Sequence, residues 1–142
     1  MLILRCSSSA ASMHELVKAA QGMLLLDPAA MRTKKELEAA FLLAESEFSA
    51  KKNISGKMAN EALLFLANET NFSSAARKIG AKSVKDFVLV SKKGIPISKL
   101  KKKLLLKKCR RLALPEWGKK IGKYSEGGLA IERMALSRIL NR

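Results

Sequence analysis

The sequence predicts an α+β fold in which a small antiparallel sheet packs with several helices. Short apolar runs rich in Ile, Leu and Val are separated by stretches whose apolar residues recur at helical spacing. A chain of 142 residues with 48% hydrophobic side chains can bury one core and is too short for two ordinary domains. We therefore expect a single domain over residues 1–142, with a C-terminal helix available for docking a partner.

Three apolar segments are predicted strands: residues 1–5, 23–26 and 86–91. The last of them, DFVLVS, is rich in β-branched and aromatic side chains, as strands are. No apolar run approaches the roughly 18 residues that a membrane span needs, and the N-terminus lacks the basic region of a signal peptide. We expect a cytoplasmic protein without a membrane partner.

Helices are predicted over residues 12–21, 33–48, 57–67 and 71–79, where apolar residues form stripes. Asn71 can cap the fourth helix, and Gly80 suits the left-handed position beyond its end. Capping-box spacing, a Ser or Thr followed three residues later by Glu, occurs at Ser12 with Glu15 and at Thr33 with Glu36.

The second part of the chain is strongly basic. Residues 92–142 hold 16 basic and 3 acidic side chains, a net of +13 of the total +16. Between positions 92 and 111 ten of twenty residues are basic, none is acidic, and the apolar residues keep helical spacing. We predict one amphipathic helix there, ended by Pro115, then an irregular segment and a last helix from 125 to about 140. A charge of this size and sign implies a polyanion as partner.

Enzyme chemistry is not indicated. The sequence has no Gly-rich phosphate loop, and His14, the sole histidine, is interpreted as a surface or half-buried side chain. Cys6 and Cys109 are the only cysteines, too few for a zinc site or a disulfide framework, and Cys109 is interpreted as an inert packing residue. We expect no catalytic residue, no cofactor and no metal.

The lysine-rich helix has three interpretations: a nucleic-acid surface, an inert solubilising face or a membrane-surface helix. The absence of acids disfavours the inert face, and the absence of large aromatics on the apolar stripe disfavours the membrane. Few aromatic residues lie near these lysines in the sequence, so contacts with a nucleic acid would be mostly to its phosphates. The predicted secondary basic surface comprises Lys99, Lys102, Lys103 and Lys107.

Two further segments are candidate interaction sites. Ser73 and Ser74 lie in the first turn after Asn71 and could bind an anion, although ordinary capping is the commoner role. The stretch 71–91 also resembles a DNA-binding helix-turn-helix, but its would-be recognition helix contains FVLV, which favours a strand. The last helix is apolar nearly all round, so it either crosses the core or presents a face to a partner.

Four motifs, in this order, resemble one family. They are Thr33-Lys34-Lys35, residues 60–67 (NEALLFLA), residues 75–82 (AARKIGAK) and residues 131–136 (IERMAL). The chain resembles the small kinase-binding subunit of the KEOPS complex, known in eukaryotes as the binding protein of the atypical Bud-type kinase. The similarity covers residues 1–91 and 128–140. In the turn between the second and third motifs, family members tend to carry a Gly and an Arg where this chain has Asn68 and Thr70.

The resemblance implies a non-catalytic subunit that binds tRNA by its single-stranded 3′ CCA end while partner subunits place threonylcarbamoyl on an anticodon-loop adenosine. It implies that the last helix docks on the atypical kinase and, through it, joins the threonylcarbamoyl transferase. On this basis the expected kinase-binding residues are Leu136, Ile139 and Leu140. The expected tRNA-binding residues are Lys57, Asn71, Ser73, Ser74, Arg77, Lys78 and Lys82. The alternative is a stand-alone basic RNA- or DNA-binding module, ribosome-associated or of helix-turn-helix type.

Overall fold

The computed structural model describes residues 1–31, 33–121 and 123–140, and for Ile121 and Leu140 the backbone alone. The chain divides into two compact units, each made from two stretches of sequence. Unit 1 comprises Met1–Met31 with Gly80–Ala113, and unit 2 comprises Arg32–Ile79 with Leu114–Arg142. The expectation of a single domain stays a prediction, and each unit is described by itself.

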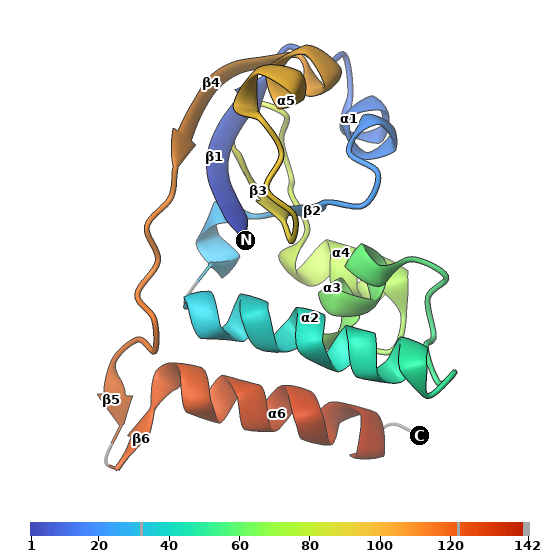
Figure 1. Ribbon diagram of the computed structural model, residues 1–142, viewed down its shortest axis with the longest axis vertical. Coiled ribbons are helices and arrows are strands. Elements are labelled where there is room, and N and C mark those ends of the chain that lie inside the picture. Colours follow the sequence, from blue (N-terminus) through green and yellow to red (C-terminus); the bar gives the residue numbers. More distant parts are fainter. Residues whose placement is uncertain (32, 122, 141–142) are drawn as a thin grey trace. The chain divides into compact units, whose positions relative to one another are not determined.

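Unit 1 is built on a four-stranded sheet (Figure 1). The strands are β1 (Leu2–Ser8), β2 (Leu24–Leu26), β3 (Phe87–Ser91) and β4 (Leu106–Arg111). Their order is β2-β3-β1-β4, and every neighbouring pair is antiparallel. The predicted α+β class with a small antiparallel sheet is confirmed.

Two helices cover one face of this sheet, α1 (Met13–Ala19) and α5 (Ile97–Leu104). Alternate residues of β1 and β3 point toward these helices because side chains of a strand alternate between its faces. A short 3-10 helix, η1 (Pro28–Ala30), follows β2. The core cluster of unit 1 is Leu2, Leu4, Cys6, Leu16, Ala20, Met23, Phe87, Leu89, Leu100, Leu104 and Leu106.

Unit 2 is helical apart from a two-stranded ribbon. Its helices are α2 (Lys34–Ser49), α3 (Met58–Ala67), α4 (Phe72–Ile79) and α6 (Glu126–Leu140), and its ribbon pairs β5 (Lys120–Ile121) with β6 (Tyr124–Ser125). Helix α2 packs against α3 and α6, and α3 packs against α4 and α6. Central buried side chains are Leu37, Phe41, Leu64, Phe65 and Met134. Among the described residues, no helix combines the length and apolarity needed to cross a membrane.

The predicted capping signals determine where the helices begin. Ser12 Oγ accepts the N–H of Glu15 at 3.3 Å, and Thr33 with Glu36 forms a complete capping box. The next two N–H groups of α2, from Lys34 and Lys35, donate to the carbonyls of residues 115 and 116 at 2.9 and 3.2 Å. The segment before β5 is therefore fastened to the start of α2, because helix termini leave N–H groups in need of partners.

Two local predictions are wrong. The basic segment is not one helix to Pro115: α5 ends at Leu104, Leu105 takes a left-handed conformation (φ 52°), and β4 follows at once. Strand β4 pairs with β1, a long-range interaction that overrides local helical spacing. Gly80 is not left-handed; it forms a bridge with Leu26 beside β2.

Candidate nucleic-acid and partner interfaces

The start of α4 holds three of the predicted tRNA-binding residues. Asn71 Oδ1 accepts the N–H of Ser74 at 3.1 Å, so Asn71 caps the helix as the sequence predicted. Ser73 is exposed and Ser74 is half-buried. The turn thus presents polar groups at the positive end of a helix, an arrangement that favours anions.

The cations of this region differ in how they are held. Lys78 Nζ donates to the carbonyl of Ala67 at 2.8 Å and lies 3.9 Å from a carboxylate oxygen of Glu69. Lys78 therefore ties α4 to the end of α3 as well as carrying charge. Lys57 stands before α3 and is exposed, and Arg77 is exposed in the last turn of α4.

Asn68 ends α3 in the left-handed conformation, with φ 54° and ψ 42°. Its N–H donates to the carbonyl of Phe65 at 3.1 Å. Asparagine tolerates this conformation better than other residues with a side chain, and glycine adopts it most readily. Asn68 therefore makes the same kind of turn that a glycine would make at this position.

Lys82 is not part of this group, because it belongs to unit 1. It lines a hollow of about 570 Å³ together with Arg5, Asp27 and Asp86. The structure thus places six of the seven predicted tRNA-binding residues in unit 2 and the seventh in unit 1.

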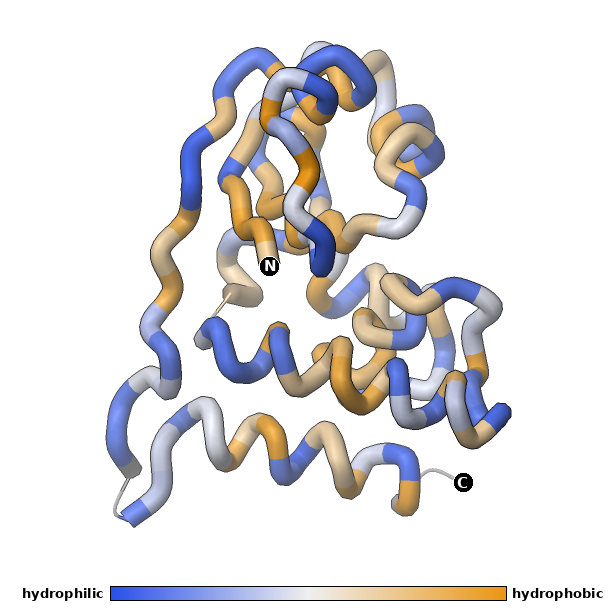
Figure 2. The backbone as a smooth tube through the Cα atoms, viewed as in Figure 1, coloured by the Kyte–Doolittle hydropathy of each residue, from blue (hydrophilic) through white to orange (hydrophobic). Residues whose placement is uncertain are grey.

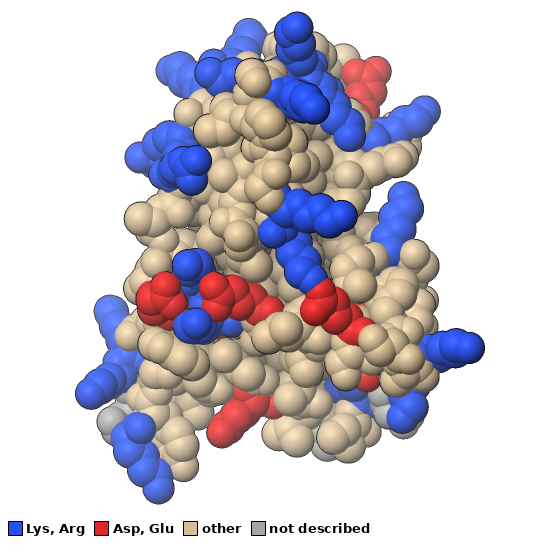
Figure 3. Space-filling view, viewed as in Figure 1, with Lys and Arg blue, Asp and Glu red and all other residues tan. Residues whose placement is uncertain are grey.

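The secondary basic surface lies on two elements of unit 1. Lys99, Lys102 and Lys103 are exposed on α5, whereas Lys107 is exposed on β4 and not on a helix. Figure 3 shows blue side chains gathered where Figure 1 draws α5 and β4, with few acids beside them. Acidic and basic groups are instead mixed at the start of α2, where Lys34 and Lys35 pair with Glu38 and Glu116. The charge on α5 and β4 is thus far less compensated.

Helix α6 has one covered and one uncovered side. Ala130 and Met134 are buried, and hydrophobic and hydrophilic stretches alternate along the helix in Figure 2. Leu136 and Ile139 are 51% and 68% exposed. The third predicted docking residue, Leu140, has a side chain outside the described residues. Ile131, Met134 and Ala135 are expected from the sequence to form the core side of this helix; Met134 is buried and Ile131 is half-buried, but Ala135 is exposed, so the expectation is wrong for Ala135.

A buried ionic cluster, absent from the sequence-based expectations, fixes α6 within unit 2. One guanidinium nitrogen of Arg138 lies 2.6 Å from Glu61 Oε1, and the two groups form an ion pair whose angles are not those of a hydrogen bond. The other terminal nitrogen lies 3.4 Å from a carboxylate oxygen of Glu47. The guanidinium also stacks 4.4 Å from the centre of the Phe65 ring. Glu61 Oε2 accepts the N–H groups of Ile54 and Ser55 at 3.1 and 2.7 Å.

Nothing in the sequence indicated that Arg5, Lys108 and Arg110 would come together, because that requires the pairing of β1 with β4. In the described part of the chain, no group of three or more His, Cys, Asp or Glu side chains is placed to hold a metal ion.

No family model matches the chain, and no curated protein matches it.

Proposed function

We propose that this chain is a non-catalytic, cytoplasmic RNA-binding protein that serves as the tRNA-gripping, kinase-binding small subunit of a KEOPS-type complex. The observation that carries RNA binding is the exposed, acid-free set of cations on α5 and β4, within a protein of net charge +16. Such a surface attracts phosphates and gains affinity by releasing counterions.

Four features support the KEOPS assignment. The four motifs stand in family order, and the observed fold is of the class that the resemblance implies. Asn68 adopts the conformation that suits the family's glycine. Leu136 and Ile139 offer an uncovered apolar side on α6, as a helix that docks on a kinase needs.

In this proposal the mechanism is positioning. Lysines, arginines and the capped start of α4 hold the phosphates and single-stranded end of tRNA, while the partner kinase and transferase subunits carry out the chemistry. The partners are therefore tRNA, the atypical kinase and, through the kinase, the threonylcarbamoyl transferase.

A second candidate is a stand-alone basic nucleic-acid-binding module. It is favoured by one observation: the densest cations belong to α5 and β4 in unit 1, whereas the residues implied by the resemblance belong mainly to unit 2. A module of this kind would bind through phosphates without regard to a particular RNA end.

The two functions are separated by an electrophoretic mobility-shift series on the full chain. The probes are intact tRNA, the same tRNA without its 3′ CCA nucleotides, and an RNA duplex. A KEOPS subunit should prefer intact tRNA clearly over the other two. Equal affinity for all three would favour the stand-alone module, and absence of binding to any of them would contradict both.

A further inference from the structure

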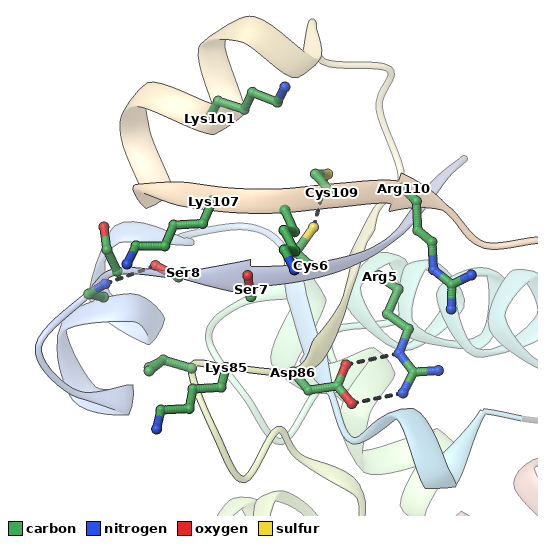
Figure 4. Close-up of a pocket in the computed structure, with 14 residues that line it drawn as sticks. Arg5, Cys6, Ser7, Ser8, Lys85, Asp86, Lys101, Lys107, Cys109 and Arg110 are labelled. Atoms are coloured by element: carbon green, nitrogen blue, oxygen red, sulfur yellow. Dashed lines mark hydrogen bonds and ion pairs between the residues drawn. The ribbon is translucent and has the colours of Figure 1, made fainter.

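A hollow of unit 1 lies along the β1–β4 edge of the sheet and measures about 890 Å³ (Figure 4). We call it the β1–β4 groove. Of the residues that the structure describes, one carboxylate, Asp86, lines it, and Ser7, Ser8 and Ser9 add hydroxyl groups. Its cationic lining residues are Arg5, Lys85, Lys101, Lys107, Lys108 and Arg110.

The strand register explains how four of these side chains come to one face. Arg5 of β1 lies directly opposite Arg110 of β4, and Ser7 lies opposite Lys108. Residues two apart on a strand share a face of the sheet. Arg5, Ser7, Lys108 and Arg110 therefore lie on the face that points away from the core of unit 1, whereas Cys6 points into that core. Figure 4 shows the two guanidinium groups on the same side of the strands.

The single acid does not neutralise the two arginines. Both oxygens of Asp86 accept hydrogen bonds from Arg5, at 2.9 and 2.8 Å. The pKa of Asp86 is lowered chiefly by this hydrogen bond, with the charges of Arg5 and then Arg110 adding to it. Asp86 therefore stays ionised at neutral pH and orients Arg5, while Arg110 keeps its positive charge without a carboxylate of its own in the groove.

This arrangement costs stability, because like charges directly opposite each other on neighbouring strands repel. Lysines on an edge strand such as β4 can discourage sheets from pairing edge to edge. That role does not account for Arg5, which lies on β1 between two other strands. Opposed arginines on one face are instead suited to an anion between them, since a guanidinium binds a phosphate through two parallel hydrogen bonds.

The residues that line the groove also indicate which class of anion it would bind. Among the described residues, none that lines the groove is aromatic, so bases have no ring to stack on there. The apolar residues that line the groove are small or half-buried, so they offer no side chain that could insert into a lipid layer. Lysine is frequent in the lining but depleted in protein–protein interfaces, which disfavours a protein partner. A row of cations and hydroxyls along an open groove fits the repeated phosphates of a nucleic-acid backbone.

We propose that the β1–β4 groove binds the phosphodiester backbone of RNA, with Arg110 and Lys108 contacting phosphates and Arg5, held by Asp86, acting beside them. The proposal rests on the proposed RNA-binding function and assigns part of it to a site outside the residues implied by the family resemblance.

The test compares two full-length double variants that each remove two positive charges from unit 1. The groove variant is Lys108→Gln with Arg110→Gln, which leaves the Arg5–Asp86 pair intact. The matched control is Lys18→Gln with Lys93→Gln, two exposed lysines that do not line the groove. Affinity for a labelled single-stranded polyuridine oligonucleotide is measured by fluorescence anisotropy from about 50 to about 200 mM salt.

The groove variant should bind roughly tenfold more weakly at about 0.1 M salt, and its log–log salt slope should shrink by about 1.4, the value for two lost single-strand phosphate contacts. The control should change far less. Equal losses in both variants would overturn the groove while leaving RNA binding itself intact. If the unmodified protein binds no RNA, the proposed function fails with it.

A second readout locates the ligand. Lys85 is exposed and lines the groove, so bound RNA should slow its acetylation by an N-hydroxysuccinimide ester, followed by peptide mass spectrometry. Protection should persist in the control variant and be lost in the groove variant. Tight RNA binding without protection of Lys85 would overturn the assignment. Protection by polyglutamate or by anionic phosphatidylserine vesicles, but not by RNA, would overturn the ligand class.

Discussion

Arg138 supplies the positive charge that offsets the buried carboxylate of Glu61 in unit 2. Its side chain is only 5% exposed, and its partner Glu61 is fully buried. A buried carboxylate is tolerable when a cation and hydrogen-bond donors surround it, and Glu61 has both in Arg138 and the N–H groups of Ile54 and Ser55. The cluster thus links α6, α3 and the loop before α3.

Replacing Arg138 with alanine should therefore destabilise the protein by about 3–5 kcal/mol, the usual cost of leaving a buried charge without its partner. Urea denaturation of the full chain measures the change. The matched variant Arg138→Met with Glu61→Gln, which removes both charges, should recover most of the loss. If Arg138→Ala costs less than about 1 kcal/mol, the cluster contributes little to the fold.

Cys6 is a second residue whose environment sets its chemistry. It is 3% exposed, and its Sγ lies 3.0 Å from Cys109 Sγ on the neighbouring strand. Burial first, and then the hydrogen bond with Cys109, raises the pKa of the Cys6 thiol well above its ordinary value. The folded protein therefore keeps this proton at a pH where the unfolded chain releases it.

The consequence for stability has a definite sign. The contribution of Cys6 is fully present below the ordinary thiol pKa of about 8.5 and is lost as pH rises above it. Between about pH 8.5 and about pH 10, the free energy of unfolding should fall more steeply in the unmodified protein than in Cys6→Ser, by at most about 1.4 kcal/mol per pH unit. Urea titrations under reducing conditions measure both slopes. Parallel curves would contradict the raised pKa.

At the scale of elements, sequence patterns predicted what local chemistry controls. Ser12 and Thr33 begin helices because each side chain accepts the N–H of the residue three positions later, a contact that local sequence alone determines. The boundary between α5 and β4 escaped prediction because it depends on β1, about a hundred residues earlier, and on a left-handed Leu105. The opposed Arg5 and Arg110 were hidden for the same reason, since no local spacing reveals a cross-strand register.

Helix α6 shows the same division between what spacing reveals and what it does not. Its apolar circumference allowed two alternatives, a helix that crosses the core or one that presents a face to a partner, and in the structure Leu136 and Ile139 are exposed. The buried Arg138 of the same helix was not predicted, because nothing in the local sequence shows that two carboxylates from α2 and α3 lie beside it.

The exposed side of α6 gives a prediction for the kinase. Ile139→Glu should cost several kcal/mol of association, because an unpaired carboxylate would enter an apolar contact. The thermal melting of the free protein should hardly change, since Ile139 is already 68% exposed. Calorimetric titration against the cognate kinase subunit measures the effect.

The matched control is Leu42→Glu on α2, which places the same charge on an apolar residue that is 65% exposed. It should leave kinase binding unchanged. If both variants bind the kinase normally, the kinase docks on another surface; if Ile139→Glu unfolds the free protein, Ile139 belongs to the core.

At the scale of the whole molecule, the positive charge is unevenly shared along the chain, with +13 of +16 in residues 92–142. The α5 lysines offer phosphate contacts that any RNA can use, because they stand among no base-reading or stacking groups. The capped start of α4 and its neighbouring cations form the part that the family resemblance links to the tRNA 3′ end. Affinity and end recognition are therefore expected to be separable.

Two triple variants test this separation by each removing three positive charges. The first, Lys99→Gln with Lys102→Gln and Lys103→Gln, should weaken binding of intact and CCA-trimmed tRNA alike and reduce the salt slope by about 0.7 to 0.9 per lost contact. The second replaces Lys57, Arg77 and Lys78 with Gln and should abolish the preference for intact tRNA. Because Lys78 also binds the carbonyl of Ala67, thermal melting must show that the second variant is folded. If the second variant is folded and still prefers tRNA with an intact 3′ end, that end is recognised by other residues. The tRNA-binding residues implied by the resemblance are then wrongly assigned.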